Sequence, residues 1–190
     1  MKKLFLLLLA GLSFTVNAQD DCQYTIISNE AGTEIKTTSD YLMYEKVFGG
    51  TSQFIFFSMS NTGGVPLLNF QLLAKSKEFP PAYCLDKNSK IYIQLLNGKI
   101  ITLLSATEDA CSKLIYDGSE KNNIRVLTGS FFFTKGSIEE LESSTITFIR
   151  VKYASETMDY PIRKELQSET IKGTYFPEAY FMKNLKCILQ

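Results

Sequence analysis

Four cysteines and several adjacent carboxylates are the residues of this chain that could take part in chemistry, and the chain contains no histidine. Histidine is the usual general base near neutral pH, the partner of serine and cysteine nucleophiles, and a common ligand of zinc and copper. Its absence removes those mechanisms and leaves carboxylates as the remaining catalytic groups. The chain also lacks Gly-x-Ser-x-Gly, Ser-x-x-Lys and glycine-rich phosphate-binding motifs.

The carboxylates occur as neighbouring pairs at Asp20-Asp21, Glu108-Asp109 and Glu139-Glu140. A glycosidase needs two carboxyl groups that face each other across a cleft, and sequence neighbours do not show that arrangement. We interpret the three pairs as solvated loops or helix caps. The oxygen-rich loops 86–89 and 117–123 lack the spacing of a full calcium loop and are interpreted as turns. We therefore assign no catalytic, cofactor-binding or metal-binding residue, and we expect no cofactor.

Residues 1–18 have the pattern of a secretory signal peptide. Two lysines precede an apolar run over 4–12, and small residues at 16–18 form a cleavage box. The apolar run is shorter than the roughly 20 residues that span a bilayer, so we expect no membrane span in the mature chain. Cys22 does not follow the cleavage site directly, which excludes a lipoprotein signal. These features predict a periplasmic or secreted protein.

The cysteines of an exported chain are expected to form disulfides, and their number here is even. Apolar runs on both sides of Asn97-Gly98 predict a hairpin with a two-residue turn, in which opposed residue numbers sum to 195. Cys84 and Cys111 also sum to 195, so we expect these two to be joined. That leaves Cys22 to pair with Cys187. The alternative is that one or both pairs stay reduced.

Charge identifies no partner. Removal of Lys2 and Lys3 with the signal leaves 18 basic and 20 acidic residues, with no basic cluster that would indicate a nucleic-acid or lipid surface. The chain has no tryptophan, which weakens a sugar-binding interpretation. The remaining residues 19–190 have the length of a single domain with a core of its own, and we expect one β-rich domain.

Short aromatic and β-branched runs between turn residues predict about eight or nine strands. The expected strands are 22–28, 41–48, 51–59, 67–74, 91–96, 99–104, 124–134, 145–153 and 158–163. Gly49-Gly50 fits a second two-residue turn, which pairs Tyr44 with Ile55 and Leu42 with Phe57. A short helix over 41–48 is the alternative. This pattern favours a mainly β fold, either an antiparallel β-sandwich or a strongly bent sheet, with one short helix and a C-terminal helix.

Two helices complete the expected elements. Ser137 and Glu140 have the spacing of a capping box, which would open a short helix ending near residue 142. The second helix begins at Pro177 and runs to about residue 189. In this helix three apolar residues share one face, which we expect to pack on the sheet. They are Phe181, Leu185 and Ile188.

Two further groups of residues are weighed as binding surfaces. Arg150 and Lys152 alternate with apolar residues, and we interpret their face as solvent-exposed rather than as an anion site. Tyrosines are numerous enough to form an aromatic contact surface, although tyrosine suits cores as well as interfaces. The residues considered are Tyr83, Tyr92, Tyr116, Tyr153, Tyr160, Tyr175 and Tyr180.

Several segments together carry a resemblance. They are the signal ending in Asn-Ala-Gln, Cys22-x-Tyr24, and the stretches 44–49, 90–98 and 146–151, followed by a terminal helix with Lys186-Cys187. In these the chain resembles a group of small exported proteins of Bacteroidota that have no assigned activity. The resemblance implies a β-rich exported domain in the cell envelope, and it transfers no catalytic residue.

These observations predict an exported, non-catalytic binding or interaction module of the cell envelope. Sheet edges readily bind extended segments, so we expect a protein, a peptide or an envelope component as the partner, held by a sheet face or edge. We expect no nucleic-acid partner, and the oligomeric state stays open. The alternative function is a carboxylate-dependent hydrolase acting on envelope or extracellular glycans or peptides. It requires two acids that converge in one cleft, at least one of them with a raised pKa.

Overall fold

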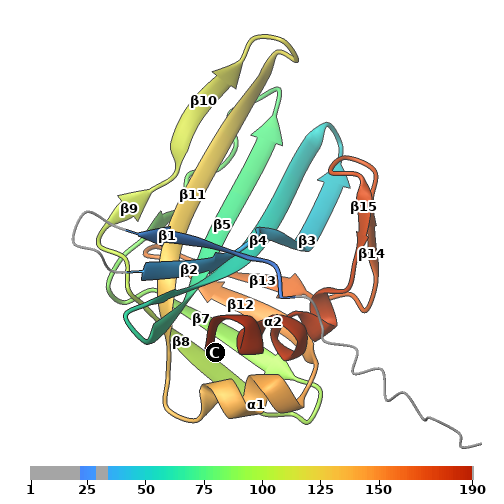
Figure 1. Ribbon diagram of the computed structural model, residues 1–190. Coiled ribbons are helices and arrows are strands. Elements are labelled where there is room, and N and C mark those ends of the chain that lie inside the picture. The colour runs from blue at the N-terminus through green and yellow to red at the C-terminus, as the bar shows by residue number, and fades with distance from the viewer. Residues whose placement is uncertain (1–21, 29–33, 190) are drawn as a thin grey trace, which may run out of the picture.

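The computed structural model describes residues 22–28 and 34–189. The expected signal peptide, the Asp20-Asp21 pair and a turn expected at 29–32 lie outside the described residues. Over these residues the fold is mainly β, with antiparallel sheets that are not closed and with two α-helices, one of them in the C-terminal part of the chain (Figure 1). The expected fold class is therefore confirmed, in its form of a strongly bent sheet.

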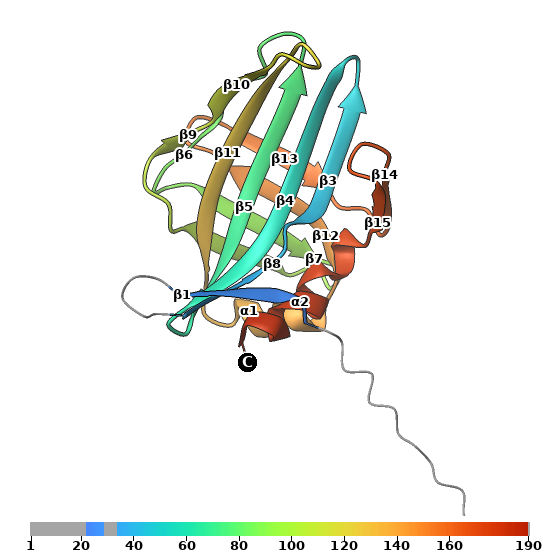
Figure 2. The same ribbon diagram turned by 45° about the horizontal axis from the view of Figure 1, so that its top comes forward.

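Eleven strands form the main sheet in the order β1-β2-β4-β5-β11-β8-β7-β12-β13, with β3 added on β4 and β10 on β11. Its first layer holds β3 (Tyr41–Phe48), β4 (Thr51–Thr62), β5 (Val65–Ser76), β10 (Lys113–Asp117) and β11 (Asn122–Phe133). From the last residues of β4, the strands β2 (Glu34–Thr38) and β1 (Tyr24–Ser28) extend the sheet across the lower end of this layer (Figures 1 and 2). Its second layer holds β7 (Lys90–Leu95), β8 (Ile100–Ser105), β12 (Ile146–Lys152) and β13 (Thr157–Pro161). Two small ladders join β6 (Cys84–Leu85) to β9 (Ala110–Cys111) and β14 (Leu166–Ser168) to β15 (Gly173–Tyr175).

The long strand β11 makes the bend. It pairs with β5 over most of its length, from Asn123 to Phe132, but with β8 only through its last three residues, Phe131 to Phe133. The sheet therefore passes from one layer to the other at the end of β11. Figures 1 and 2 show the result, in which β7, β8 and β12 cross beneath β4, β5 and β11.

The core lies between these two layers because their strands alternate buried and outward residues. β5 buries every second residue from Leu68 to Ser76, and β7 buries Ile91, Ile93 and Leu95. This period of two matches the alternation of side chains along a pleated strand. Aromatic rings fill the space between the layers.

Both helices lie at one end of the bent sheet (Figures 1 and 2). Helix α2 (Tyr180–Leu189) follows a 3₁₀ turn, η1 (Pro177–Ala179), and contacts β2, β4 and helix α1 (Ser137–Ser143). The expected apolar face is confirmed, because Phe181, Leu185 and Ile188 are all buried. Asn61 on β4 donates a hydrogen bond from Nδ2 to the Ile188 carbonyl at 2.6 Å, which satisfies one of the free carbonyls at the end of α2.

The predicted capping box at Ser137 is wrong. The N-cap of α1 is Gly136, whose φ of 79° lies in the left-handed region that glycine adopts without strain. Ser137 is the first helical residue, and its hydroxyl donates to the Thr134 carbonyl at 2.6 Å. The serine hydroxyl therefore bonds the preceding turn instead of a helix amide.

The Gly49-Gly50 hairpin forms as predicted, and the helix alternative for 41–48 is wrong. Both glycines have positive φ, 58° and 77°, as a two-residue type I′ turn requires. Tyr44 faces Ile55 as expected, but Leu42 faces Phe56 and not Phe57. The register shifts because a β-bulge lies between Leu42 and Tyr44.

The Asn97-Gly98 hairpin also forms, but its predicted register is wrong by one residue. Opposed residues sum to 194, as in Ile91 opposite Leu103. The loop has three residues because the Leu95 amide donates to Lys99 and the Gly98 amide donates to Leu95. Gly98 has a φ of 85°, which is the arrangement of a type I turn followed by a left-handed residue.

Candidate functional site

The two carboxylate pairs that the structure describes lie on different segments and do not form one site. Glu139 and Glu140 lie in the first turn of α1, where Glu140 pairs with Lys99. Glu108 and Asp109 are exposed in the segment between β8 and β9. Within residues 22–28 and 34–189, no group of three histidine, cysteine or carboxylate residues is arranged to hold a metal ion.

The two oxygen-rich loops are turns closed by their own aspartates. Asp86 Oδ1 accepts hydrogen bonds from the Asn88 amide at 2.9 Å and the Ser89 hydroxyl at 3.0 Å. Asp117 Oδ1 accepts from the Ser119 hydroxyl at 2.6 Å and the Ser119 amide at 2.9 Å. These bonds, led by those of the serine hydroxyls, lower the pKa of both aspartates because they stabilise the ionised form.

The Arg150 face is exposed, as expected, and its guanidinium is already paired. Arg150 donates from Nε and Nη2 to the two carboxylate oxygens of Asp159 on β13, at 2.6 and 2.8 Å. These hydrogen bonds lower the pKa of Asp159 and raise that of Arg150. The same guanidinium lies over the Phe148 ring, 6.0 Å from its centre. Phe148, Arg150 and Lys152 line a groove of about 410 Å³. Because the Arg150 guanidinium is bound to Asp159, an anion in this groove would meet Lys152 but not a free guanidinium.

Most of the tyrosines considered as a contact surface are in the core. The buried ones are Tyr83, Tyr153, Tyr160 and Tyr180. Tyr153 and Tyr160 share a buried hydrogen bond between their hydroxyls, 2.9 Å apart. Tyr116 on β10 is the clear exception, with 63 % of its surface exposed.

Both expected disulfides are present, Cys84–Cys111 and Cys22–Cys187. The second joins the segment before β1 to helix α2. The first is a cross-strand bridge, since Cys84 and Cys111 face each other in the β6–β9 ladder. Their numbers sum to 195 whereas those of the adjoining β7–β8 ladder sum to 194. The turn at 86–89 and the irregular segment after β8 separate the two ladders and absorb the difference.

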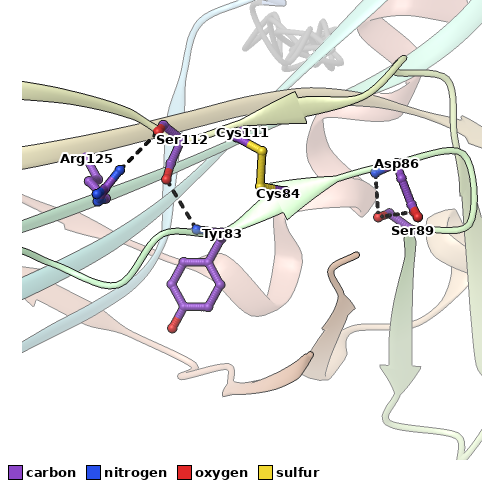
Figure 3. The surroundings of a disulfide bond; sticks show 7 residues. All are labelled: Tyr83, Cys84, Asp86, Ser89, Cys111, Ser112 and Arg125. Carbon is purple, nitrogen blue, oxygen red and sulfur yellow. Dashed lines mark hydrogen bonds between the residues drawn. A yellow bond between two sulfur atoms is a disulfide. The ribbon is translucent and has the colours of Figure 1, made fainter. Parts of the chain in front are cut away.

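The residues beside the Cys84–Cys111 bridge hold the start of β10 in place (Figure 3). The Ser112 amide donates to the Tyr83 carbonyl at 2.8 Å, and the Tyr83 amide donates to the Ser112 hydroxyl at 3.2 Å. Arg125 on β11 donates from Nη1 to the Ser112 carbonyl at 3.2 Å and from Nε to the Pro80 carbonyl at 2.8 Å. Three hydrogen bonds to Ser112 and the disulfide at the neighbouring Cys111 thus fix the residue that precedes β10.

Strand β10 itself is an open sheet edge. In the described part of the chain it pairs with β11 alone, and both views show it at the outer side of the first layer (Figures 1 and 2). Leu114, Ile115 and Tyr116 are exposed by 43, 53 and 63 %. Alternate residues of an edge strand direct their N–H and C=O groups away from the sheet, where another strand can bind them.

Natural edge strands are usually protected by being very short, by proline, by charged side chains or by a covering segment. β10 is short and has a charge at each end, Lys113 and Asp117, but among the described residues it has no proline and no covering strand, and its three central residues are apolar or aromatic. β13 ends in Pro161 and carries the Arg150–Asp159 ion pair, and β3 contacts β14, β15 and η1. β1 also exposes Ile26 and Ile27, but it ends beside residues 29–33, outside the described part.

The strands β2, β10, β14 and β15 are not among those expected from the sequence patterns. For β10 a signal exists in the apolar run 114–116, which stands between Cys111 and the turn at Asp117. A strand followed by a turn and the predicted strand at 124–134 is the pattern of a hairpin. The far side of β10 is unpaired in the described part of the chain because of the order of strands in the sheet. A local sequence pattern does not predict that order.

No helix in the described ranges is long and apolar enough to cross a membrane. Comparisons with protein-family models, with curated proteins and with solved structures find no match to this chain.

Proposed function

We propose that this protein is an exported, non-catalytic interaction module of the cell envelope that binds an extended segment of a protein or peptide along β10. The single observation that supports the proposal most directly is the open, apolar edge of β10. The two disulfides of the protein support export, because such bonds persist mainly in oxidising compartments.

The pairing of β10 with β11 defines the two faces that a bound strand would meet. Residues opposite one another in the ladder share a face, so Ile115 lies with Ile124 and Val126 on one side. Leu114 and Tyr116 lie on the other side. A bound segment would gain affinity from backbone hydrogen bonds along the edge and specificity from side chains that meet these apolar groups.

Preorganisation favours this use of the edge. Binding costs less free energy when the receiving strand is already ordered. The Cys84–Cys111 bridge and the Arg125 hydrogen bond to the Ser112 carbonyl hold the segment before β10, and the five-residue ladder with β11 holds the strand itself.

No specific observation favours the alternative hydrolase. A general acid needs a carboxyl whose pKa is raised, whereas Asp86, Asp117 and Asp159 have lowered pKa values. Glu45 and Glu169 line one groove of about 500 Å³ beside β3, but Lys46 and Arg163 line it too. This is a mixed-charge surface, and the hydrolase is not proposed further.

The test is a display selection. Random heptapeptides are panned against the immobilised, disulfide-bonded mature protein, and enriched peptides are titrated against three forms: wild type, Ile115→Lys and Ile100→Lys. Ile115 lies in the middle of the β10 edge, whereas Ile100, 65 % exposed on β8, is a matched exposed isoleucine away from it. We expect alternating apolar peptides whose affinity falls at least about tenfold in Ile115→Lys and is unchanged in Ile100→Lys.

Backbone recognition is checked with N-methylated versions of the enriched peptides. One version of each peptide is methylated at the odd-numbered amides and another at the even-numbered amides. Only one of the two versions should lose binding, because in a paired strand only every second amide faces β10. Selection without enrichment, or binding that survives Ile115→Lys, contradicts the proposal.

A further inference from the structure

The sequence of β10 is complementary to itself. When two copies of Lys113–Asp117 run antiparallel about Ile115, opposed residue numbers sum to 230. Lys113 then lies opposite Asp117 of the second copy, Leu114 opposite Tyr116, and Ile115 opposite its own counterpart. Opposite charges and aromatic–aliphatic neighbours are the cross-strand pairs that stabilise antiparallel sheets.

Other registers lose this complementarity. A shift by two residues places either Lys113 or Asp117 opposite Ile115, depending on its direction, and removes both charge pairs. A shift by one residue places either Lys113 opposite Tyr116 or Asp117 opposite Leu114, and it reverses which face each side chain occupies. A parallel, in-register pairing brings the two lysines together and the two aspartates together. The antiparallel register centred on Ile115 is therefore the one in which all five positions match.

The groups that this register uses are accessible. Lys113 is exposed, as are the three apolar residues that follow it. The hydrogen bonds that Asp117 accepts within its turn all end on Oδ1, so the lone pairs of Oδ2 can accept from a further partner such as a lysine ammonium. Lys75 of the same chain also contributes a favourable charge to this carboxylate. The free side of β10 meets no other strand in the described part of the chain.

We infer that a second copy of this chain binds to the β10 edge, so that the two first layers join into one continuous sheet across a two-fold axis at Ile115. The interface is isologous, because the same strand serves both copies. This inference deepens the proposed function and rests on it for the use of the edge. Five residues on each side make a small interface, so the dimer forms and dissociates reversibly with concentration.

Self-pairing has a consequence for ligand binding. The dimer covers the edge that an extended peptide needs, so dimer formation and peptide binding exclude one another. High local concentration of the protein therefore closes the site, and dilution opens it. The peptide affinity measured for the wild type should fall as the protein concentration rises into the range where dimers form.

Charge exchange tests the register. Sedimentation velocity of the disulfide-bonded mature protein is measured across the micromolar to millimolar range for wild type, Lys113→Asp and Asp117→Lys. Each single change places like charges opposite each other twice, and we expect dimerisation to weaken at least about tenfold. An equimolar mixture of the two variants restores both attractive pairs and should form a heterodimer. Ser119→Ala, which removes one turn hydrogen bond without changing a charge, is the control for damage to the Asp117 turn.

Cysteine cross-linking provides a second measurement that needs no charge change. The four native cysteines are all bridged, so an introduced cysteine is the only thiol. Ile115→Cys faces itself across the axis and should oxidise to a covalent dimer. Leu114→Cys faces Tyr116 of the second copy and should cross-link poorly, like Ile100→Cys on β8.

The outcomes separate the two proposals. A wild type that stays monomeric, together with Ile115→Cys that cross-links no faster than Ile100→Cys, overturns the dimer and leaves peptide binding intact. The inference is also overturned if Lys113→Asp still dimerises as the wild type does and Leu114→Cys cross-links as readily as Ile115→Cys. The interface then lies elsewhere on the protein. Dimers of the expected register without any peptide enrichment would support the inference and refute the proposed function.

Discussion

Gly129 on β11 contacts Leu85 on β6 through its bare α-carbon. A Cβ built on this glycine would overlap Cδ1 of Leu85 and would stand 3.0 Å from the Thr107 hydroxyl oxygen. Leu85 is 1 % exposed and belongs to the main core, so it has little room to move. The strand that carries the bend of the sheet is thus packed directly against the ladder that holds the first disulfide.

Gly129→Ala should therefore destabilise the protein. Inserting a methyl into a packed site typically costs about 1–3 kcal/mol. Urea unfolding with the disulfides intact measures the change, and Gly118→Ala is the matched control. A Cβ at Gly118 would meet only Tyr116, at 4.0 Å, so this control should unfold within about 0.5 kcal/mol of wild type. Equal stability of the two variants would contradict the close contact.

Removing each disulfide should have a different cost. The chain-entropy model predicts losses of about 3.5 kcal/mol for Cys84→Ala with Cys111→Ala and about 5 kcal/mol for Cys22→Ala with Cys187→Ala. The difference arises because the bridges span 27 and 165 residues. Urea unfolding of both double variants checks the order. The reverse order would show that local packing, rather than loop closure, determines the effect of the bridges.

Arg125→Lys should loosen β10 while the core stays folded. Arginine reaches the Pro80 and Ser112 carbonyls from two different nitrogens, Nε and Nη1, whereas lysine ends in a single nitrogen on a differently shaped side chain, so we expect at least one of these two hydrogen bonds to be lost. Hydrogen exchange of the amides at 113–117 should become about tenfold faster, as loss of one charged hydrogen bond implies. Amides of β5 serve as the internal control. Unchanged exchange in β10 would show that Arg125 does not order the edge.

The Tyr153–Tyr160 pair should show strong coupling in a double-mutant cycle. Tyr153→Phe leaves the buried Tyr160 hydroxyl without its partner and should cost about 1–3 kcal/mol, while changing both residues to phenylalanine should cost less than the sum of the single changes. Urea midpoints at neutral pH provide the values. Tyr116→Phe, at an exposed tyrosine, is the control and should be nearly neutral. Additive single changes would argue against the hydrogen bond.

Stability should fall in alkaline solution. Burial raises the pKa of Tyr153, Tyr160 and Tyr180 above the ordinary value because it disfavours the phenolate. Above pH about 10 these tyrosines ionise in the unfolded chain but not in the folded one, so the unfolded state binds fewer protons and stability decreases as pH rises. The contribution is fully present below that pH.

The pH dependence can be assigned with the double phenylalanine variant of the same tyrosine pair. Changing Tyr153 and Tyr160 to phenylalanine removes two of the five phenols whose pKa is raised by burial, the others being Tyr44, Tyr83 and Tyr180. The slope of unfolding free energy above pH about 10 should therefore fall by at least about two fifths. Urea titrations at a series of alkaline pH values give both slopes. Parallel curves for variant and wild type would assign the alkaline loss to other groups.

Local patterns in the sequence predict much of this fold. Alternation of apolar residues predicts β5, β7 and β12, and the Gly49-Gly50 turn places Tyr44 opposite Ile55. The Cys84–Cys111 bridge follows from a hairpin even though the hairpin register is wrong by one residue. A bridge needs only that the two segments come close, whereas register depends on whether the loop holds two residues or three.

The sequence by itself therefore determined the mainly β class, the pairing of the four cysteines and the apolar face of α2, because each follows from a pattern along the chain: alternation, a hairpin turn between Cys84 and Cys111 that leaves the other two cysteines, and helical spacing. Only the tertiary structure decided the bend at the end of β11, the burial of Tyr83, Tyr153, Tyr160 and Tyr180, and the open edge of β10. These depend on which distant strands lie side by side. An edge is defined by the strand that is missing beside it, and that is a property of the whole sheet.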